Sequence, residues 1–257
     1  MEVDGGKGPP GRHEETSCVV RALVPSRPPP RHMSTGAIHL AIIPDGNRRW
    51  AKKRLLQPWK GHETAIKNFR AITDWCRNDP RVGVLTVWCF STENWKRDPE
   101  EVDHLMKIYE DYLRREGATF VEKKTRFIHT GRLDRIPASL ATLIKETAEA
   151  TSGQTGFTLN LAVDYGGKDE LVRAIRKIPD PKNITEELLK DYLDHPELPD
   201  IDLVIRTSGE QRTSNFFLWE STYAEWDFVD TYFPDLTPAD VEQSVAAFAK
   251  RTRRFGS

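Results

Sequence analysis

Short apolar runs alternate along the chain with longer segments in which apolar residues recur every three or four positions. Short apolar runs bounded by turn residues are typical of strands that are buried on both faces of a parallel sheet. On this basis we expect strands at 38–43, 82–90, 125–130, 158–163, 203–206, 216–219 and 226–229.

The longer segments have the spacing of helices with one apolar face. The pattern predicts helices at 64–76, 140–150, 168–178 and 238–251. A further long helix opens at Pro99. Its apolar side consists of Val102, Leu105, Ile108, Tyr109, Tyr112 and Leu113. Because strands and helices alternate throughout, we expect an α/β fold: a single domain with a mostly parallel central sheet flanked by helices.

Composition changes this picture only at the amino terminus. The first 36 residues are rich in Gly, Pro and Arg and include Pro28, Pro29 and Pro30. Such a segment buries too little apolar surface to fold, so we expect a flexible tail over 1–36. The remaining residues, 37–257, are enough for one domain with a sizeable core.

The charge balance narrows the choice of partners. The chain has 38 Lys and Arg against 39 Asp and Glu, so its formal net charge is -1. No global basic field points to nucleic acid. A negatively charged substrate would have to be bound by a local basic cluster instead.

The cysteines and the hydropathy pattern bear on the compartment. Cys18, Cys76 and Cys89 form no C-x-x-C pair. Their odd number argues against a disulfide framework or a zinc site, so we expect a reducing, cytoplasmic environment. No apolar run is long enough to span a bilayer, whereas a peripheral membrane contact stays open.

Three polar loops follow predicted strands, at 45–50, 91–97 and 206–214. In a parallel α/β sheet, ligands bind beyond the carboxyl ends of the strands, where such loops meet. We therefore expect the three loops to form one site.

The first loop, within I-I-P-D-G-N-R-R-W, offers one carboxylate, Asp45, followed by Gly46 and Asn47. Gly46 lets the backbone approach a ligand, and the next helix begins with N–H groups that suit phosphate. A basic run without any acid follows: Arg48, Arg49, Lys52, Lys53, Arg54 and Lys60. This run is either a solvated helix face or a diphosphate cradle, and its place after a buried strand favours the cradle.

The second loop combines hydroxyl, acidic, amide, aromatic and cationic side chains: Ser91, Thr92, Glu93, Asn94, Trp95, Lys96 and Arg97. Taken alone, it fits a helix-capping turn as well as a loop that closes over a ligand. Trp95 favours the second interpretation, because an exposed aromatic ring in a polar loop can cover an apolar ligand.

The third loop contains Arg206, Ser208, Arg212, Thr213 and Ser214. Arg has a fork of donors that fits phosphate oxygens, although a surface turn with ordinary ion pairs would have the same composition. Beyond this loop, Glu225 lies in an aromatic stretch. Together with Asp45 it has the oxygen donors that Mg²⁺ bound to a diphosphate prefers.

With these motifs in this order, the chain resembles the cis-prenyltransferases, the undecaprenyl diphosphate synthase family. The resemblance extends from about His39 to Gly256. It rests on A-I-I-P-D-G-N-R-R-W-A, G-H at Gly61 and His62, F-S-T-E-N-W-K-R, Y-G-G, D-L-V-I-R-T-S-G-E-Q-R-T-S-N-F and Y-A-E. Several long motifs in the family's order make the match specific.

The resemblance implies an enzyme that condenses isopentenyl diphosphate with an allylic prenyl diphosphate, leaves a cis double bond and holds the product in a hydrophobic tunnel. Asp45 would bind Mg²⁺ and carry the catalysis with Asn94, a candidate for assisting proton loss. Residues that would bind the allylic diphosphate are Gly46, Asn47, Arg48, Arg49 and Trp50, with His62 nearby. Residues that would bind isopentenyl diphosphate are Arg206, Arg212, Thr213 and Ser214. The mobile loop over both substrates would contain Ser91, Thr92, Glu93, Trp95 and Arg97.

Two features of this resemblance concern the number of subunits in the enzyme. Arg254, Phe255 and Gly256 resemble the R-x-G ending, which reaches into the partner subunit's site. Glu225 would be a second metal ligand contributed across the dimer. Because one chain carries both the catalytic motifs and this ending, we expect a self-sufficient homodimer.

The chain also departs from the family pattern. Pro58 stands where many members have an Arg that contacts diphosphate, so Arg54 or Lys60 would have to replace it. Tyr112 is large for a helix that lines the product tunnel. It either shortens the product or is a neutral repacking. We expect a product of short to medium chain length.

Two other functions stay open: irregular coupling of five-carbon units, and a non-catalytic partner subunit that binds prenyl diphosphates. The intact S-T-E-N-W and R-T-S-G-E-Q-R segments favour ordinary elongation over irregular coupling. A non-catalytic subunit would have lost the D-G-N acid or the Arg pair, and both are present.

Overall fold

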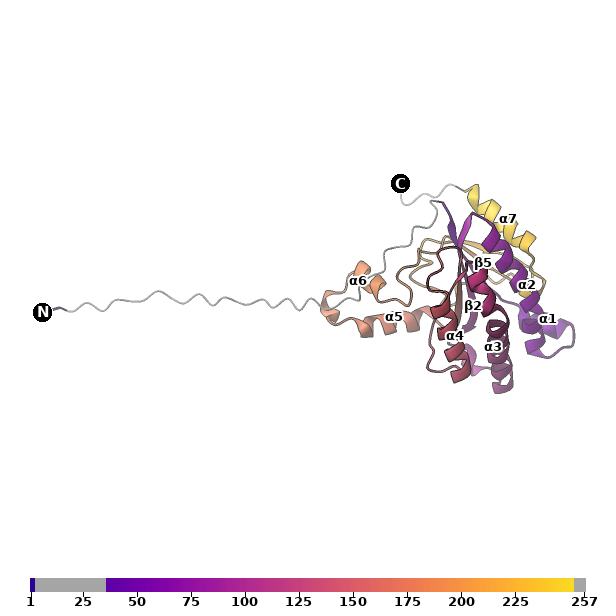
Figure 1. The fold of residues 1–257 in the computed structure, drawn as a ribbon, viewed down its shortest axis with the longest axis horizontal. Helices are drawn as coiled ribbons and strands as arrows, with labels where there is room; N and C mark the ends of the chain where they lie inside the picture. Colours follow the sequence, from indigo (N-terminus) through magenta and orange to yellow (C-terminus); the bar gives the residue numbers. More distant parts are fainter. Residues whose placement is uncertain (3–35, 252–257) are drawn as a thin grey trace.

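The computed structural model describes residues 1–2 and 36–251, which form an all-parallel six-stranded sheet with helices on both faces (Figure 1). The strands are β1 (Ile38–Ile43), β2 (Val82–Ser91), β3 (Arg126–Thr130), β4 (Thr158–Tyr165), β5 (Leu203–Arg206) and β6 (Glu225–Phe228). Their order is β3-β4-β2-β1-β5-β6, and every neighbouring pair is parallel. The expected α/β fold with a parallel sheet is confirmed.

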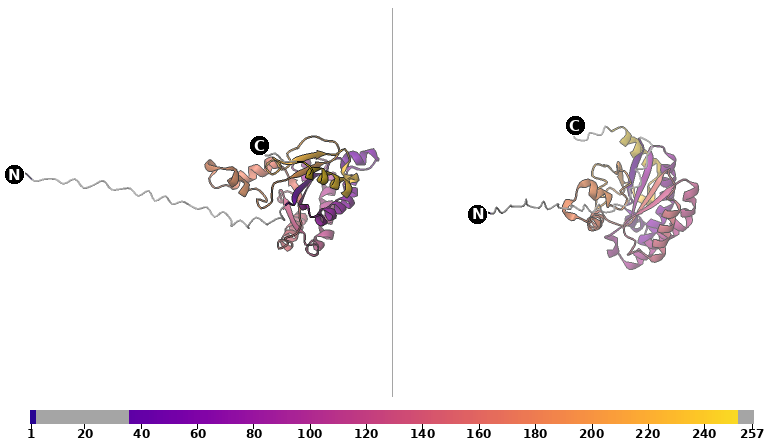
Figure 2. Two further views of the ribbon diagram at one scale, coloured as in Figure 1. Left: turned by 90° about the horizontal axis from the view of Figure 1, so that it is seen from above. Right: turned by 60° about the vertical axis from the view of Figure 1, so that its left-hand side comes forward.

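The helices are α1 (Asn47–Lys53), α2 (Pro58–Asn78), α3 (Pro99–Glu122), α4 (Ala138–Ala150), α5 (Gly167–Lys177), α6 (Glu186–Asp191) and α7 (Pro238–Ala249). Helices α2, α3, α4 and α7 pack on one face of the sheet around the main core, where Phe69, Leu105, Leu140 and Val241 are buried. Figures 1 and 2 show α5 and α6 on the opposite side, standing away from the sheet. No helix within the described residues has the length and apolar character needed to cross a membrane.

Two elements differ clearly from the sequence pattern. Residues 216–219, expected as a strand, form turns, because Ser214, Asn215 and Phe217 have positive φ values that do not fit an extended ladder. Phe216 and Phe217 of this run are buried instead by stacking, with the Phe217 ring 4.2 Å from that of Tyr165. Helix α2 starts at Pro58, well before the expected 64, since Pro suits the first turn of a helix.

Some expectations fall outside the described residues. The predicted tail over 1–36 is described only at Met1, Glu2 and Gly36, and the structure does not describe Cys18 or Arg254. At the other end, α7 stops at Ala249, two residues short of the predicted 251. The expected domain over 37–257 is therefore described only as far as 251.

A chain of side-chain hydrogen bonds crosses β3, β4, β2 and β1 inside the sheet. Thr130 donates to Asn160 Oδ1 (2.9 Å), Asn160 Nδ2 donates to Thr86 Oγ1 (3.1 Å), and Thr86 donates to His39 Nε2 (2.7 Å). His39 Nδ1 then donates to the Pro199 carbonyl (2.9 Å). Burial lowers the pKa of His39 to about 4, so its ring is neutral; because Nδ1 is the donor to the Pro199 carbonyl, Nε2 is the nitrogen that accepts from Thr86.

We expect the His39 network to make the fold sensitive to mild acid. The pKa of His39 is about 4 in the folded chain and 6.5 without the fold, so the unfolded state binds the proton first as the pH falls. The contribution of neutral His39 to the free energy of unfolding is complete above pH 6.5 and falls by about 2 kcal/mol between pH 7 and pH 5. Urea unfolding at both pH values measures this drop.

The His39→Gln variant isolates the effect. We expect it to be less stable than the wild type at pH 7, because the network is broken, but to lose less stability at pH 5. His104→Gln changes a partly exposed histidine on α3 and should reproduce the wild-type drop. If the His39→Gln variant loses as much stability between pH 7 and pH 5 as the wild type, His39 is not the source of the acid sensitivity.

Candidate active site

The three predicted loops meet at one edge of the sheet. Strands β2, β1 and β5 are neighbours, and Ile43 lies opposite Arg206 in the register of β1 and β5. Because the three strands run in the same direction, the loops that contain Asp45, Asn94 and Arg212 all follow carboxyl ends at this edge. Residues far apart in sequence thus come together.

The turn after β1 depends on a glycine. Gly46 has a φ of 93°, and a Cβ there would lie 2.5 Å from Tyr232 Cδ1 and 2.8 Å from the Ser208 Cβ. The turn leads directly into Asn47, whose Nδ2 donates to the Pro44 carbonyl at 2.7 Å. The buried Oδ1 of Asn47 has no partner within 36–251, and such an acceptor favours a bound donor.

Asp45 and Arg206 form an ion pair at the centre of this edge. Arg206 Nη2 lies 2.9 Å from Asp45 Oδ2, and Nη1 donates to Ser214 Oγ at 2.9 Å and to the Arg212 carbonyl. The Arg206 side chain is 3% exposed, whereas that of Asp45 is 31% exposed. Arg206 is therefore fixed, while Asp45 keeps an accessible carboxylate. The buried Nε of Arg206 has no partner in the described part of the chain.

A buried carboxylate on α3 links two further arginines. The Glu101 side chain is 2% exposed; its Oε1 accepts from Arg97 Nη1 at 3.1 Å, and its Oε2 lies 3.4 Å from Arg48 Nε. Arg49 pairs instead with Glu210, with 2.8 Å between Nη1 and Oε1. Cations from α1 and from the loop before α3 are thus held together by one shared acid.

Two polar hollows and one apolar cavity join at this edge. The first hollow, of about 350 Å³, is lined by Asp45, Gly46, Asn47, Arg48, Arg49, Arg97, Glu210 and Arg212. The second, of about 440 Å³, is lined mainly by Asp45, Ser91, Glu93, Asn94, Arg97, Arg206, Ser214 and Asn215. Pro44 and His62 line both hollows and the apolar cavity, so these two residues mark the junction.

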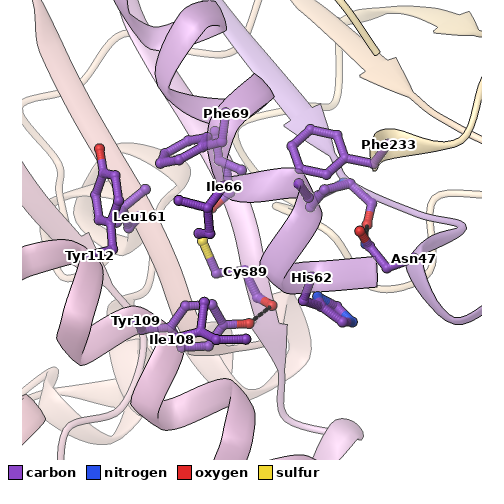
Figure 3. A pocket seen from close by; sticks show the side chains of 13 residues that line it. Asn47, His62, Ile66, Phe69, Cys89, Ile108, Tyr109, Tyr112, Leu161 and Phe233 are labelled. Carbon is purple, nitrogen blue, oxygen red and sulfur yellow. Dashed lines mark hydrogen bonds between the residues drawn. The ribbon is translucent and has the colours of Figure 1, made fainter. Parts of the chain in front are cut away.

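The apolar cavity lies between α2, α3 and β2. Figure 3 shows Asn47 and His62 at one end and Tyr112 at the other, with Ile66 and Cys89 between them. The cavity volume is about 50 Å³. Since an apolar cavity of about 150 Å³ accommodates benzene, a prenyl chain can enter here only if side chains or helices move.

His62 is neutral at the junction. Its pKa is lowered to about 3, chiefly by burial and also by the nearby charges of Arg97 and Arg48. Its buried Nε2 has no hydrogen-bond partner among residues 36–251. Gly61 makes this position possible, because a Cβ there would collide with the Asn47 carbonyl. His62 is therefore uncharged, and its buried ring nitrogen lacks a hydrogen-bond partner in the described residues.

The comparisons with known proteins agree with this geometry. Residues 43–256 match the family described as "Putative undecaprenyl diphosphate synthase". The chain belongs to this family. An isoprenyl transferase of Wolinella succinogenes is 41% identical over 219 residues, which cover 85% of this chain and 96% of the relative.

Two further relatives extend this result. A tritrans,polycis-undecaprenyl-diphosphate synthase (geranylgeranyl-diphosphate specific) of Pyrococcus abyssi is 43% identical over 228 residues, covering 85% of this chain and 86% of the relative. The structure of lavandulyl diphosphate synthase from Lavandula x intermedia in complex with dimethylallyl diphosphate has a TM-score of 0.80 at 35% identity. It covers 86% of this chain and 99% of that chain. The chain is a cis-prenyltransferase.

The two hollows of this cis-prenyltransferase are lined by most of the site residues that the sequence predicts. Those that do not line them are Trp50, Thr92, Trp95, Thr213 and Glu225, and Arg254 lies outside the described residues. Trp50 Nε1 donates to Asp235 (2.8 Å), and Trp95 Nε1 donates to Asp164 (2.8 Å). Trp95 also packs edge-on against Phe90, with 5.0 Å between ring centroids. Trp95 is thus anchored to the fold, in contrast to the exposed ring that the sequence suggested.

Glu225 lies away from Asp45 within one chain. It starts β6 opposite Leu203, whereas Asp45 follows the opposite, carboxyl-terminal end of the neighbouring strands. Glu225 accepts from Arg251 Nη1 at 2.7 Å. The two carboxylates therefore do not meet in one copy of this cis-prenyltransferase, and a shared metal would require a second copy.

The sequence did not point to several residues that build the site. Glu101, Cys89, Glu210 and Asn215 are among them. Glu101 has no helical spacing signal, because Arg97 lies before the helix N-cap Asp98 and has extended backbone. Asn215 has no such signal, because its Nδ2 donates to Glu93 (3.0 Å) across 122 positions of sequence.

Proposed function

We propose that the chain condenses isopentenyl diphosphate with an allylic prenyl diphosphate and releases diphosphate, giving a (Z)-prenyl diphosphate of short to medium length. The observation that carries this proposal is the junction at Pro44 and His62, where two polar hollows join one apolar cavity. A reaction between two diphosphates that extends one apolar chain needs these three spaces side by side.

The first hollow suits the allylic diphosphate. Arg48, Arg49 and Arg97 line it, and guanidinium groups match phosphate oxygens in charge and geometry. The second hollow suits isopentenyl diphosphate, because Arg206 is fixed there beside Ser214 and its Nε lacks a partner in the described residues. Arg97 lines both hollows and would lie between the two diphosphates, and Arg212, expected for isopentenyl diphosphate, lines the first hollow.

Asp45 would hold Mg²⁺ together with diphosphate oxygens. Its carboxylate is accessible, and Mg²⁺ commonly binds one or two carboxylates along with substrate phosphates. Within 1–2 and 36–251, no three His, Cys, Asp or Glu residues gather as a metal site. The substrate would therefore supply most of the ligands. When bound, Mg²⁺ neutralises charge on the departing diphosphate.

The proposed reaction breaks the bond between carbon 1 of the allylic substrate and its oxygen, and the diphosphate leaves with the electron pair. Arg48, Arg49 and Arg97 stabilise the negative charge that develops on it. The double bond of isopentenyl diphosphate supplies the electrons of the new carbon–carbon bond, and a proton leaves the neighbouring carbon. Asn94, in the second hollow, would assist this loss. The apolar cavity keeps water from the allylic cation.

We further propose that the enzyme works as a homodimer. The Arg251–Glu225 ion pair supports this, because Arg251, three residues before the expected R-x-G ending, lies beside the expected second metal ligand. The growing chain would extend along the apolar cavity, which would widen into a tunnel.

Irregular coupling of two five-carbon units is the second candidate. It draws on the similarity to lavandulyl diphosphate synthase in complex with dimethylallyl diphosphate, itself a five-carbon allylic diphosphate. The two candidates differ in the carbon skeleton of the product, because only chain elongation yields a regular head-to-tail product with a new cis double bond.

The test is incubation of purified protein and Mg²⁺ with isopentenyl diphosphate and a series of allylic diphosphates. Product length is measured by mass spectrometry, and skeleton and double-bond geometry by NMR. We expect regular cis products, and loss of turnover with EDTA that excess Mg²⁺ restores. The absence of any product from every allylic primer would refute the enzyme proposal, and a branched product would favour irregular coupling.

Glu101 provides a separate prediction. We expect Glu101→Gln to lower kcat/KM by about 10- to 100-fold, because Arg48 and Arg97 lose the shared anion that orients them. Steady-state kinetics with each diphosphate varied in turn measures the loss. Glu110→Gln, which removes an exposed ion pair with Arg114 on the same helix, should leave kcat/KM unchanged. Equal effects of the two substitutions would contradict the positioning role.

A further inference from the structure

The loop between α1 and α2 exposes two leucines at its tip. Leu55 is 96% exposed and Leu56 is 45% exposed. Figures 1 and 2 show α1 and the loop after it at the edge of the molecule, far from α5 and α6. The loop follows the helix that starts at the first polar hollow, so it stands near the mouth of the site without lining it.

The backbone makes leucine an unexpected choice at this tip. The Leu55 N–H donates to the Lys52 carbonyl (3.1 Å), and the Leu56 N–H donates to the Ala51 carbonyl (3.0 Å). This pair of hydrogen bonds is a common way to end a helix. It requires the residue at the position of Leu55 to adopt left-handed backbone angles, which favour glycine. Leu55 has a φ of 56°. Within residues 36–251, a leucine here strains the backbone and exposes apolar surface, which favours a contact with another surface.

Cations surround the two leucines. They are Lys52, Lys53, Arg54 and Lys60. Within 36–251, Lys52 and Lys53 have no carboxylate within 4 Å, and Lys53 lies over the Tyr232 ring at 4.7 Å. Only Arg54 and Lys60 face acids, at 3.7 Å from Asp235 and 2.7 Å from Glu63. The tip is thus apolar and its margin is positively charged.

We propose that this loop docks the protein on a membrane surface that carries anionic headgroups. An apolar tip with a cationic margin is complementary to the boundary between acyl chains and negatively charged headgroups. Leu55 and Leu56 insert at that boundary, and Lys52 and Lys53 lie against the headgroup phosphates. Two leucines and a few cations give reversible binding, so the protein exchanges between the membrane surface and solution.

Vesicle flotation with the full chain tests the proposal. Vesicles of phosphatidylcholine alone are compared with an equal mixture of phosphatidylcholine and phosphatidylglycerol. We expect the wild type to float with the mixed vesicles and to be released by high salt, which screens the lysines. Leu55→Gly should reduce the bound fraction by about tenfold, because one inserted leucine is lost. The double variant with Lys52→Gln and Lys53→Gln should bind the mixed vesicles more weakly than the wild type, without a change toward vesicles of phosphatidylcholine alone.

Two controls separate docking from folding. Leu55→Gly should keep or raise the thermal midpoint of unfolding, because glycine adopts a φ of 56° without strain. Val121→Ser changes a residue of α3 that is 43% exposed outside this loop, and it should bind vesicles like the wild type. Wild-type protein that floats with neither vesicle, or a Leu55→Gly variant that floats as well as the wild type, would overturn the proposal.

Discussion

Replacing Asp45 by Ala is expected to lower kcat by about 10³-fold or more. The substitution removes the accessible carboxylate proposed to hold Mg²⁺ on the departing diphosphate. Electrostatic stabilisation of this kind is usually the largest single contribution to the rate enhancement of an enzyme. It also leaves Arg206, a nearly buried cation, without its ion-pair partner. Asp45→Asn is the sharper variant, because an amide oxygen can still accept from Arg206 while the negative charge is lost.

Both Asp45 variants are measured by steady-state kinetics and thermal unfolding. We expect the two to lose turnover alike, while Asp45→Asn keeps the wild-type unfolding midpoint within a few degrees. Asp200→Asn removes a carboxylate that pairs with Lys190 at 2.7 Å on the surface, and it should leave both quantities unchanged. Near-normal turnover of Asp45→Asn would exclude Asp45 from the mechanism.

Tyr112 is expected to set the length of the product. It lines the apolar cavity at the end opposite His62, and its ring lies 5.1 Å from that of Phe69 and 6.5 Å from that of Phe120. Replacing it by Leu, and more strongly by Ala, should lengthen the main product by at least one five-carbon unit, because space opens beyond the present end of the cavity. Mass spectrometry of the product mixture measures the shift.

The matched control is Tyr112→Phe, which keeps the ring and removes only the hydroxyl. We expect its product distribution to equal that of the wild type. The Ala variant should also unfold more easily, by about 3–5 kcal/mol, since a large buried side chain is lost. If the Leu and Ala variants both give the wild-type distribution, Tyr112 does not limit the product.

Most of the fold could be predicted because its strands are short, continuous apolar runs between turn residues. The strands over 38–43 and 203–206 match β1 and β5 residue for residue. The run at 216–219 is also short and apolar, but its Phe217 ring stacks on Tyr165. The sequence pattern alone cannot distinguish aromatic stacking from pairing in a β-sheet. Helix α6 was missed, because its few apolar positions give no periodic signal.

The site could be predicted as far as topology alone determines it. Parallel strands bring loops at their carboxyl ends together, which is why Asp45, Asn94 and Arg206 were grouped correctly in space. The surroundings of Trp50 and Trp95 could not be predicted. Their partners, Asp235 and Asp164, are 185 and 69 positions away, and composition does not reveal such pairings.

The small size of the apolar cavity has a consequence for how product length is controlled. With about 50 Å³ between α2, α3 and β2, the described part of the chain has no vacant channel of fixed depth at this place. Under the proposed function, each added unit would push aside packed side chains, so the resistance to growth would rise with the length of the chain. Elongation would stop where the cost of spreading α2 from α3 makes the next condensation slower than release of the product. Warming, which softens the packing, should then shift the product toward greater length.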